Sequence, residues 1–193
     1  MSEGQGDGKA PRRHWGLWFE PPDVTEWDLT PRPVSASAVI LSEVIDLSGA
    51  NLLGNVHGGT VMKLVDTAAG IAAMKHCGGP VVTAALDEMS FLEPVFVGEL
   101  VVVKAMVNDV GRTSLEVGVR VEAENLRTGD RVHTSSAYLV YVALDDSGTP
   151  RPVPPLEPMS HDERRRQGEA KLRRRARLAR KEAIWAARAA KGE

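Results

Sequence analysis

The chain has 193 residues, 42% of them hydrophobic and 26% charged, and its 24 basic and 26 acidic side chains give a formal net charge of −2. Such a composition is typical of a soluble globular protein with one domain and extensions, or at most two small domains. The single cysteine, Cys77, excludes an intrachain disulfide and disfavours a cysteine-based metal site. No apolar run approaches the roughly 18 residues of a membrane span.

The N-terminal part, residues 1–35, is predicted to be an arm outside the main domain. Residues 1–13 combine glycine, charge and proline, so we expect them to be disordered. Because no apolar core of a signal peptide is present there, we expect a cytoplasmic protein. Three of the four tryptophans (Trp15, Trp18 and Trp27) follow, together with Phe19. Such large rings indicate an arm that packs over the main domain or over a neighbouring subunit. Residues 36–45 then read as a first strand.

A glycine-rich loop leads into a predicted helix over residues 59–77, which Gly78-Gly79-Pro80 ends. Apolar residues lie nearly all round this helix, so we expect it to be buried. Its first backbone N–H groups have no intrahelical partner and suit a carbonyl oxygen that gains negative charge. Asp66 would lie about 10 Å further along the axis, at about 1.5 Å per residue. One reacting carbonyl group cannot contact both ends of that span. We therefore expect the acid and the amides of one site to come from different subunits.

After the helix the hydrophobic period changes to two. Strands are predicted over 81–89, 100–110, 115–123 and 133–144, and the alternation is clearest from Leu115 to Ala123. One strand, a long helix and four strands joined by short turns predict an α+β domain, an antiparallel sheet wrapped around one helix. Prolines between 150 and 158 mark the exit from this domain.

The C-terminal tail, residues 159–193, is rich in Ala, Arg, Lys and Glu and predicts a basic helix from about His161 to Lys191. From Ser160 to Glu193 it holds 12 basic and 5 acidic residues, so the rest of the chain is acidic. Small residues recur with a spacing that permits a weak coiled-coil-like seam. Nucleic-acid binding is one interpretation. We favour a solvated helix that lies against the acidic body or another subunit, and predict no nucleic-acid partner.

The loop, the helix and several later segments resemble the hotdog-fold acyl-CoA thioesterases, of the type that includes the cytosolic brain-type hydrolase and short bacterial relatives. The matching segments are Gly54-Asn55-Val56-His57-Gly58-Gly59, Met62-Lys63-Leu64-Val65-Asp66, Val81-Val82-Thr83, Gly111-Arg112-Thr113-Ser114 and Tyr141-Val142-Ala143-Leu144. The resemblance covers about residues 36–158 and is specific only in combination. It implies a five- or six-stranded antiparallel sheet curled around the long helix.

The resemblance also implies acyl-CoA hydrolysis at sites between paired subunits, without a cofactor other than the coenzyme A of substrate and product. A homodimer would hold two complete sites, and three such pairs would form a hexamer. The resemblance assigns the chemistry to Asn55 and Asp66. Asp66 is predicted to be a general base toward water or a nucleophile, with an i,i+3 ion pair to Lys63 as the alternative. Asn55 would orient the water or contact the thioester oxygen, unless it only caps the loop.

The remaining predicted site residues surround these two. The Gly59 amide is the expected oxyanion donor, and Gly58 permits close approach. His57 lies in the same loop, where a histidine more often satisfies a backbone group than acts as a base. Thr83 is expected to line the pocket. Arg112, Thr113 and Ser114 form a turn in which a cation and hydroxyls can meet coenzyme A phosphate, unless the turn is merely exposed.

Two other functions fit the same fold. A non-catalytic acyl-CoA-binding module would bind the ligand without turnover, but the presence of both Asn55 and Asp66 argues against it. An enzyme of different chemistry, such as a hydratase, would need an Asp/His pairing that is not evident. The sequence shows no Walker-type phosphate loop, no serine-nucleophile elbow and no zinc-ligand spacing, so no metal site is expected.

Overall fold

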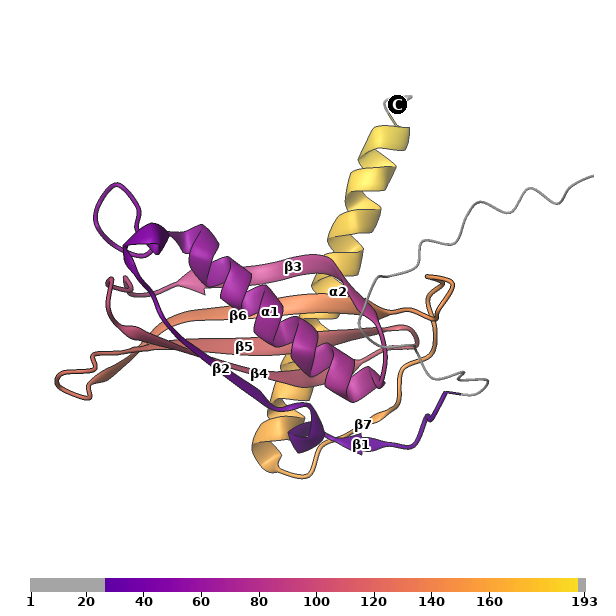
Figure 1. Ribbon diagram of the computed structural model, residues 1–193. Helices are drawn as coiled ribbons and strands as arrows, with labels where there is room; N and C mark the ends of the chain where they lie inside the picture. Colours follow the sequence, from indigo (N-terminus) through magenta and orange to yellow (C-terminus); the bar gives the residue numbers. More distant parts are fainter. Residues whose placement is uncertain (1–26, 191–193) are drawn as a thin grey trace, which may run out of the picture.

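The computed structural model describes residues 27–190, and the predictions for residues 1–13, Trp15, Trp18 and Phe19 lie outside that range. Figure 1 shows a sheet with one helix on each face. The elements in chain order are β1 (Arg32–Pro33), the 3₁₀ turn η1 (Val34–Ser37), β2 (Val39–Val44), the 3₁₀ turn η2 (Leu47–Gly49), α1 (Gly58–Cys77), β3 (Val81–Phe91), β4 (Leu100–Val110), β5 (Ser114–Glu124), β6 (Arg131–Ala143), β7 (Leu156–Glu157) and α2 (His161–Ala189).

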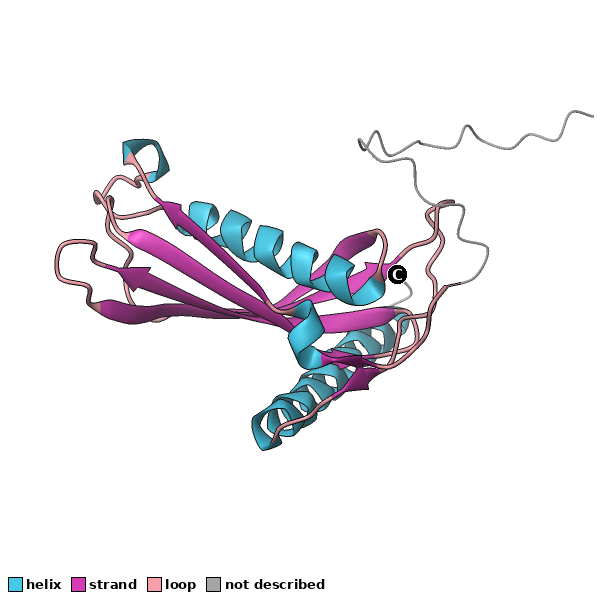
Figure 2. Cartoon of the chain, turned by 60° about the horizontal axis from the view of Figure 1, so that its bottom comes forward, coloured by secondary structure: helices cyan, strands magenta, loops and turns pink. Residues whose placement is uncertain are grey.

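The main sheet has five strands in the order β2-β4-β5-β6-β3, and all neighbours are antiparallel. The helix α1 crosses one face of this sheet, as Figures 1 and 2 both show. The predicted antiparallel sheet around one long helix is confirmed. Because β3 is an edge strand, its outer side is open along 11 residues. An open edge of this length is a template for pairing with another strand.

The predicted elements agree with the structure to within a few residues, and the largest difference is at the start of the first strand. The first strand was predicted to begin at residue 36, but residues 34–37 form η1 and β2 begins at Val39. The Ser37 hydroxyl explains the difference, because it donates to the Val34 carbonyl and accepts from the Val107 amide. A serine that bonds to local backbone groups favours a turn over a strand ladder.

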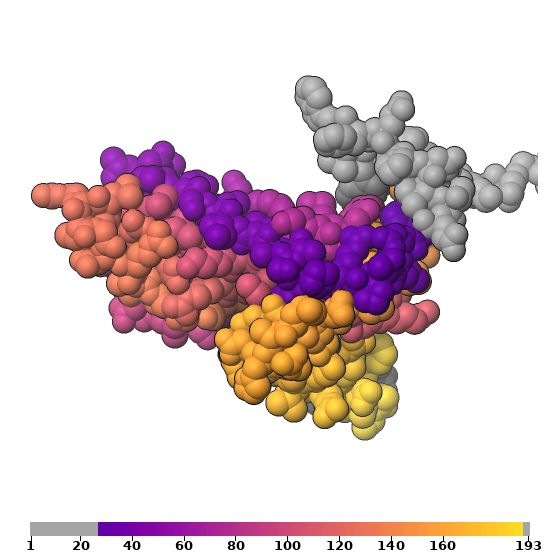
Figure 3. Space-filling model, turned by 90° about the horizontal axis from the view of Figure 1, so that it is seen from below, coloured from indigo at the N-terminus to yellow at the C-terminus, as the bar shows by residue number. Residues whose placement is uncertain are grey.

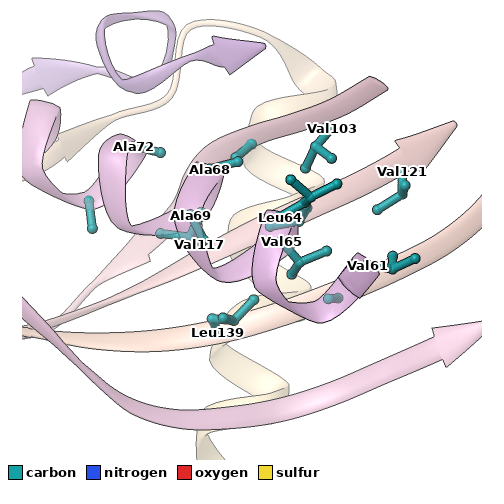
Figure 4. Packing of buried hydrophobic residues seen from close by; sticks show 14 of the residues in the cluster. Val61, Leu64, Val65, Ala68, Ala69, Ala72, Val103, Val117, Val121 and Leu139 are labelled. Carbon is teal, nitrogen blue, oxygen red and sulfur yellow. The ribbon is translucent and has the colours of Figure 1, made fainter. Parts of the chain in front are cut away.

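One side of α1 fills the core of the domain. Its alanines at 68, 69, 72 and 73 are fully buried, and Leu64 and Val65 join them. Figure 4 shows this side against side chains of the sheet, including Val103, Val117 and Leu139. The prediction that α1 is buried all round is wrong for the single chain, because Met62, Ile71 and Met74 are exposed. The exposed apolar side lies next to the open edge at β3.

Two arginines satisfy the C-terminal end of α1. Gly78 ends the helix with a positive φ of 70°, and its amide donates to the Met74 carbonyl. The Arg32 guanidinium donates to the His76 carbonyl at 2.9 Å, and that of Arg151 donates to the Cys77 carbonyl at 3.0 Å. Cations at this end complement the helix dipole. Trp27 stacks on Arg151 at 3.6 Å, so the described part of the arm packs on the domain as predicted.

The helix α2 lies on the sheet face opposite α1 (Figures 1 and 2) and projects from the body of the molecule in Figure 3. Arg173 makes a two-pronged ion pair with Glu116 of β5, with Nη2–Oε1 at 2.7 Å, and Arg177 pairs with Asp87 of β3. Both carboxylates are buried beneath the helix. The expectation of a basic helix that lies against the acidic body is therefore confirmed. No helix within residues 27–190 is both long and apolar enough to cross a bilayer.

Candidate active site

The carboxylate of Asp66 stands on the exposed side of α1 and is held by two hydroxyl groups. Thr83 Oγ1 of β3 donates to Asp66 Oδ1 at 2.9 Å, and Tyr141 Oη of β6 donates to the same oxygen at 2.8 Å. The side chain of Asp66 remains accessible to solvent. Within the described chain Asp66 makes no ion pair with Lys63, which was the alternative interpretation of its position. Asp66 and Thr83, both predicted site residues, therefore lie together.

Tyr141 contacts the predicted site residue Asp66, although the sequence analysis did not assign it a role. Its ring is buried in the core while its hydroxyl reaches α1. Burial, and after it the hydrogen bond to Asp66, raises the pKa of Tyr141 well above its ordinary value. The hydroxyl therefore stays protonated and can act as a donor. Tyr141 belongs to the quoted segment that resembles the thioesterases, but a tyrosine in an apolar strand looks like an ordinary core residue.

A histidine at the end of the glycine-rich loop caps the N-terminus of α1. His57 is the N-cap residue, and its Nδ1 accepts a hydrogen bond from the Gly59 amide at 2.9 Å. This differs from the prediction that the Gly59 amide is a free oxyanion donor, because the ring already occupies it. The role expected of a loop histidine, satisfying a backbone group, is the one observed. A Cβ on Gly59 would lie 3.1 Å from that ring nitrogen, so glycine permits the close contact.

A cavity of about 280 Å³ opens beside the start of α1. Its lining includes the loop asparagines Asn51 and Asn55, the Gly58 backbone, Phe91 and Ser135. Asn51 Oδ1 accepts from the Leu53 amide at 2.8 Å and from the Asn55 amide at 3.3 Å, which fixes its side chain. The Gly58 amide, at the first helical position, has no hydrogen-bond partner among the described residues. The cavity therefore presents amide groups beside a partly apolar wall.

The predicted site residues fall into three groups within one chain. The first comprises Asn55 with the start of α1, and the second is Asp66 with Thr83. Asp66 does not line the cavity at the loop. The third group is the turn of Arg112, Thr113 and Ser114, whose backbone bonds to Ala143 and Val153 near the C-terminal end of α1. A single chain thus keeps its acid apart from its amide-lined cavity.

A model of the thioesterase superfamily matches residues 53–129, from the loop before α1 to the turn after β5. Among curated proteins, the cytosolic acyl coenzyme A thioester hydrolase of Mus musculus is 36% identical over 155 residues. The match includes 78% of this chain and 41% of the mouse protein. The chain therefore spans less than half the length of that relative.

Two solved structures match almost over their full length. An apo-hexameric acyl-CoA thioesterase is 38% identical with a TM-score of 0.76, and the match covers 78% of this chain and 97% of that one. An acyl-CoA hydrolase from Staphylococcus aureus, in complex with butyryl coenzyme A, coenzyme A and coenzyme A disulfide, is 32% identical with a TM-score of 0.75. That match covers 81% of this chain and 95% of the other.

Alanine variants of the Staphylococcus aureus hydrolase have the same fold as this chain. They replace an asparagine, an aspartate fifteen positions later and a threonine seventeen positions after that. Asn51, Asp66 and Thr83 follow one another at the same spacings here. The sheet and α1 form the hotdog fold of these neighbours, and the chain belongs to the thioesterase superfamily.

Proposed function

We propose that this protein is an acyl-CoA thioesterase, which hydrolyses acyl-CoA to a free fatty acid and coenzyme A. The observation that carries the proposal is the accessible carboxylate of Asp66, held through one oxygen by Thr83 and Tyr141. A carboxylate fixed in this way, with its other oxygen free, is suited to act as a general base toward water. Membership of the thioesterase superfamily and the coenzyme A complexes of a similar hydrolase support the choice of substrate class.

The active site is completed by a second copy of the chain. Asp66 lies eight residues after Gly58, about 12 Å along α1 at about 1.5 Å per residue, so one acyl carbon cannot contact both. The carboxylate shares its exposed side with apolar residues of α1 and of the edge strand β3, including Met62, Met74 and Leu86. A second copy paired along β3 would cover this apolar surface. The hexameric assembly of a similar thioesterase supports such pairing, and we propose dimers that assemble further.

The reaction joins the acid of one copy to the amides of the other. A water molecule attacks the thioester carbon while Asp66 takes its proton, the C–S bond breaks, and Asp66 passes the proton on to the departing thiolate of coenzyme A. The side-chain amide of Asn51 is the best placed to contact the acyl oxygen. Its Oδ1 already accepts two backbone hydrogen bonds, so its NH₂ group remains to donate. The Gly58 amide is the second donor. Asn55 lines the same cavity and is the alternative amide.

Direct attack by the Asp66 carboxylate is the second chemical route. It would form a mixed anhydride and release coenzyme A before water enters. Both routes need the ionised carboxylate and an accessible Oδ2. They differ in whether one oxygen of Asp66 is exchanged with solvent oxygen during turnover.

Substrate binding is proposed for the turn between β4 and β5. Arg112 is exposed and forms no ion pair in the described part of the chain, so its guanidinium is available to a coenzyme A phosphate. Thr113 and Ser114 would add hydroxyl donors. This turn lies at the opposite end of α1 from the cavity. It would therefore bind the phosphate of the substrate on which Asp66 of the same chain acts, while the amides come from the other chain.

Release of free thiol from a panel of acyl-CoA substrates tests the proposed function. The wild-type protein should turn over at least one chain length, and Asp66→Asn should lose more than about a hundredfold in kcat while it binds acyl-CoA and keeps its fold. Tight binding without turnover by the wild type would instead identify a ligand-binding module. Wild-type turnover in Asp66→Asn would contradict the assigned chemistry.

A further inference from the structure

The two hydroxyl groups at Asp66 both point to one carboxylate oxygen. Tyr141 Oη and Thr83 Oγ1 lie 2.8 and 2.9 Å from Oδ1, whereas Oδ2 has no hydrogen-bond partner among residues 27–190. Rotation of the carboxylate would break both bonds. The pair of donors therefore selects one orientation and leaves the other oxygen free.

Tyr141 reaches this position from the centre of the fold. It faces α1 from β6, opposite Thr83 in the β3–β6 register, so the two hydroxyls come from neighbouring strands. Its ring is 2% exposed and belongs to the core cluster. Gly70 lies one helical turn after Asp66, and a Cβ there would lie 3.8 Å from Tyr141 Oη. That distance is an ordinary van der Waals contact, so the Tyr141 hydroxyl lies directly against this turn of the helix.

We infer that Tyr141 is the positioning residue of the active site, which orients Asp66 for proton abstraction and stabilises its ionised form. This inference rests on the proposed function, since it assigns Tyr141 a task only if Asp66 reacts. Thr83 is accessible to solvent and to a second copy, whereas the Tyr141 hydroxyl is supported by a buried ring. Tyr141 therefore provides the rigid half of the pair of donors.

The protonation state of Tyr141 agrees with this role. Because burial keeps the pKa of its hydroxyl well above the ordinary value, Tyr141 remains neutral beside the Asp66 carboxylate and donates its proton to a hydrogen bond. Hydrogen bonds donated to a carboxylate favour its ionised form. Loss of one donor should therefore move the acidic limb of the rate profile to higher pH.

A purely structural role would have a different signature. The Tyr141 hydroxyl also lies 3.0 Å from the backbone carbonyl oxygen of Asp66, and its single proton can serve only one acceptor at a time. If the backbone were the essential acceptor, removal of the hydroxyl would lower stability and leave the pH dependence of kcat unchanged. The pH profile therefore separates the two roles.

Tyr141→Phe tests the inference, with Tyr138→Phe as the matched control. Tyr138 lies on the same strand but faces the other side of the sheet, where its ring packs under the Arg173 guanidinium at 3.6 Å. We expect Tyr141→Phe to lower kcat about tenfold with little change in KM, and to move the acidic limb of the rate profile to higher pH. Tyr138→Phe should match the wild type in all three quantities.

A second measurement avoids any loss of folding. The chain has two tyrosines, so 3-fluorotyrosine incorporated into the Tyr138→Phe protein labels Tyr141 alone. The fluorinated phenol is a stronger hydrogen-bond donor, and the acidic limb should move to lower pH. An unmoved limb in both the Phe variant and the labelled protein would overturn the inference.

Asp66→Asn, assayed in parallel, separates the two proposals. If Asp66→Asn is inactive while Tyr141→Phe behaves as the wild type, the proposed function stands and the positioning role fails. If Asp66→Asn keeps wild-type turnover, the proposed function itself fails.

Discussion

The Thr83 hydroxyl of the edge strand β3 donates a hydrogen bond to the Asp66 carboxylate of α1, with 2.9 Å between Oγ1 and Oδ1. The two residues lie in consecutive elements, joined by the short turn after Gly78. Both side chains are accessible in the single chain, on the side where the sheet edge is open. The contact therefore places the proposed base, and a group that holds it, at the surface that a second copy would cover.

This contact predicts a graded response to substitution at Thr83. Thr83→Val keeps the shape but removes the donor, and we expect kcat to fall about five- to tenfold, the equivalent of a hydrogen bond to a charged group at a partly exposed site. Thr83→Ser retains the hydroxyl and should keep most of the activity. Thr67→Val is the control, because the Thr67 hydroxyl donates to the Lys63 carbonyl within α1. Steady-state thiol release measures all three, and equal rates for Val and Ser would contradict the role of the hydroxyl.

The two loop asparagines should differ in their effect on catalysis. Asn51→Asp keeps the Oδ1 acceptor that receives the Leu53 and Asn55 amides but removes the NH₂ donor. We expect kcat to fall about a hundredfold or more with the fold intact, as when one oxyanion donor is lost. Asn55→Ala should have a smaller effect. Circular dichroism and thiol release check both, and the opposite ranking would assign the donor role to Asn55.

The buried His76 predicts an acid-sensitive fold. Burial lowers the pKa of His76, whose Nε2 lies 2.9 Å from the Pro154 carbonyl oxygen. In the unfolded chain a histidine titrates near pH 6.5, at about its ordinary value. Below that pH the unfolded state binds a proton that the folded state does not, so the free energy of unfolding decreases as the pH falls toward the lowered folded-state pKa. Above that pH the residue contributes no pH dependence.

Urea unfolding between pH 7.5 and 5 at fixed protein concentration measures this dependence. The slope can reach about 1.4 kcal/mol per pH unit for one proton. His76→Gln preserves a donor toward Pro154 and cannot be protonated, so its stability should depend less on pH in the acidic part of this range. His161→Gln, at the exposed start of α2, is the control and should retain the wild-type slope. Identical slopes for the wild type and His76→Gln would exclude His76 as the cause.

The ion pairs beneath α2 predict a loss of stability when one cation is removed. Arg173→Ala leaves the Glu116 carboxylate buried without its partner and also removes the stacking on Tyr138. We expect the free energy of unfolding to fall by about 2–3 kcal/mol, less than for a fully buried pair because the arginine is partly exposed. Arg175→Ala changes an exposed residue of the same helix and should cost under about 0.5 kcal/mol. Equal losses would show that the ion pair is not the cause.

Hydrophobic periodicity predicted most of this fold, because each strand has one side in the core. The alternation from Leu115 to Ala123 places its apolar members against α1, and the predicted helix and strands appear near their predicted bounds. Periodicity could not show that η1 replaces the start of the first strand, since one serine hydroxyl decides it. The exposed side of α1 was also missed, because apolar residues around a helix look the same whether they face the core or a second subunit.

The site was predictable in part for a similar reason. Asp66 and Thr83 could be named because both lie in segments that resemble the hotdog thioesterases, whereas an acid on an apolar helix would by itself fit an ion pair with Lys63 equally well. The capture of the Gly59 amide by His57 depends on a ring orientation that spacing does not reveal. Tyr141 was hidden because its ring is a core residue and only its hydroxyl is functional.

The central claim, that one site is built from two copies, is tested most directly by complementation. Asp66→Asn and Asn51→Asp chains, each inactive alone, are co-expressed with different tags and the mixed oligomers are isolated. A mixed pair contains one site with both defects and one site with neither, so dimers that carry both tags should regain about half of the wild-type activity per chain. Activity that stays at the level of the separate variants would contradict a shared site and place the whole reaction centre within one chain.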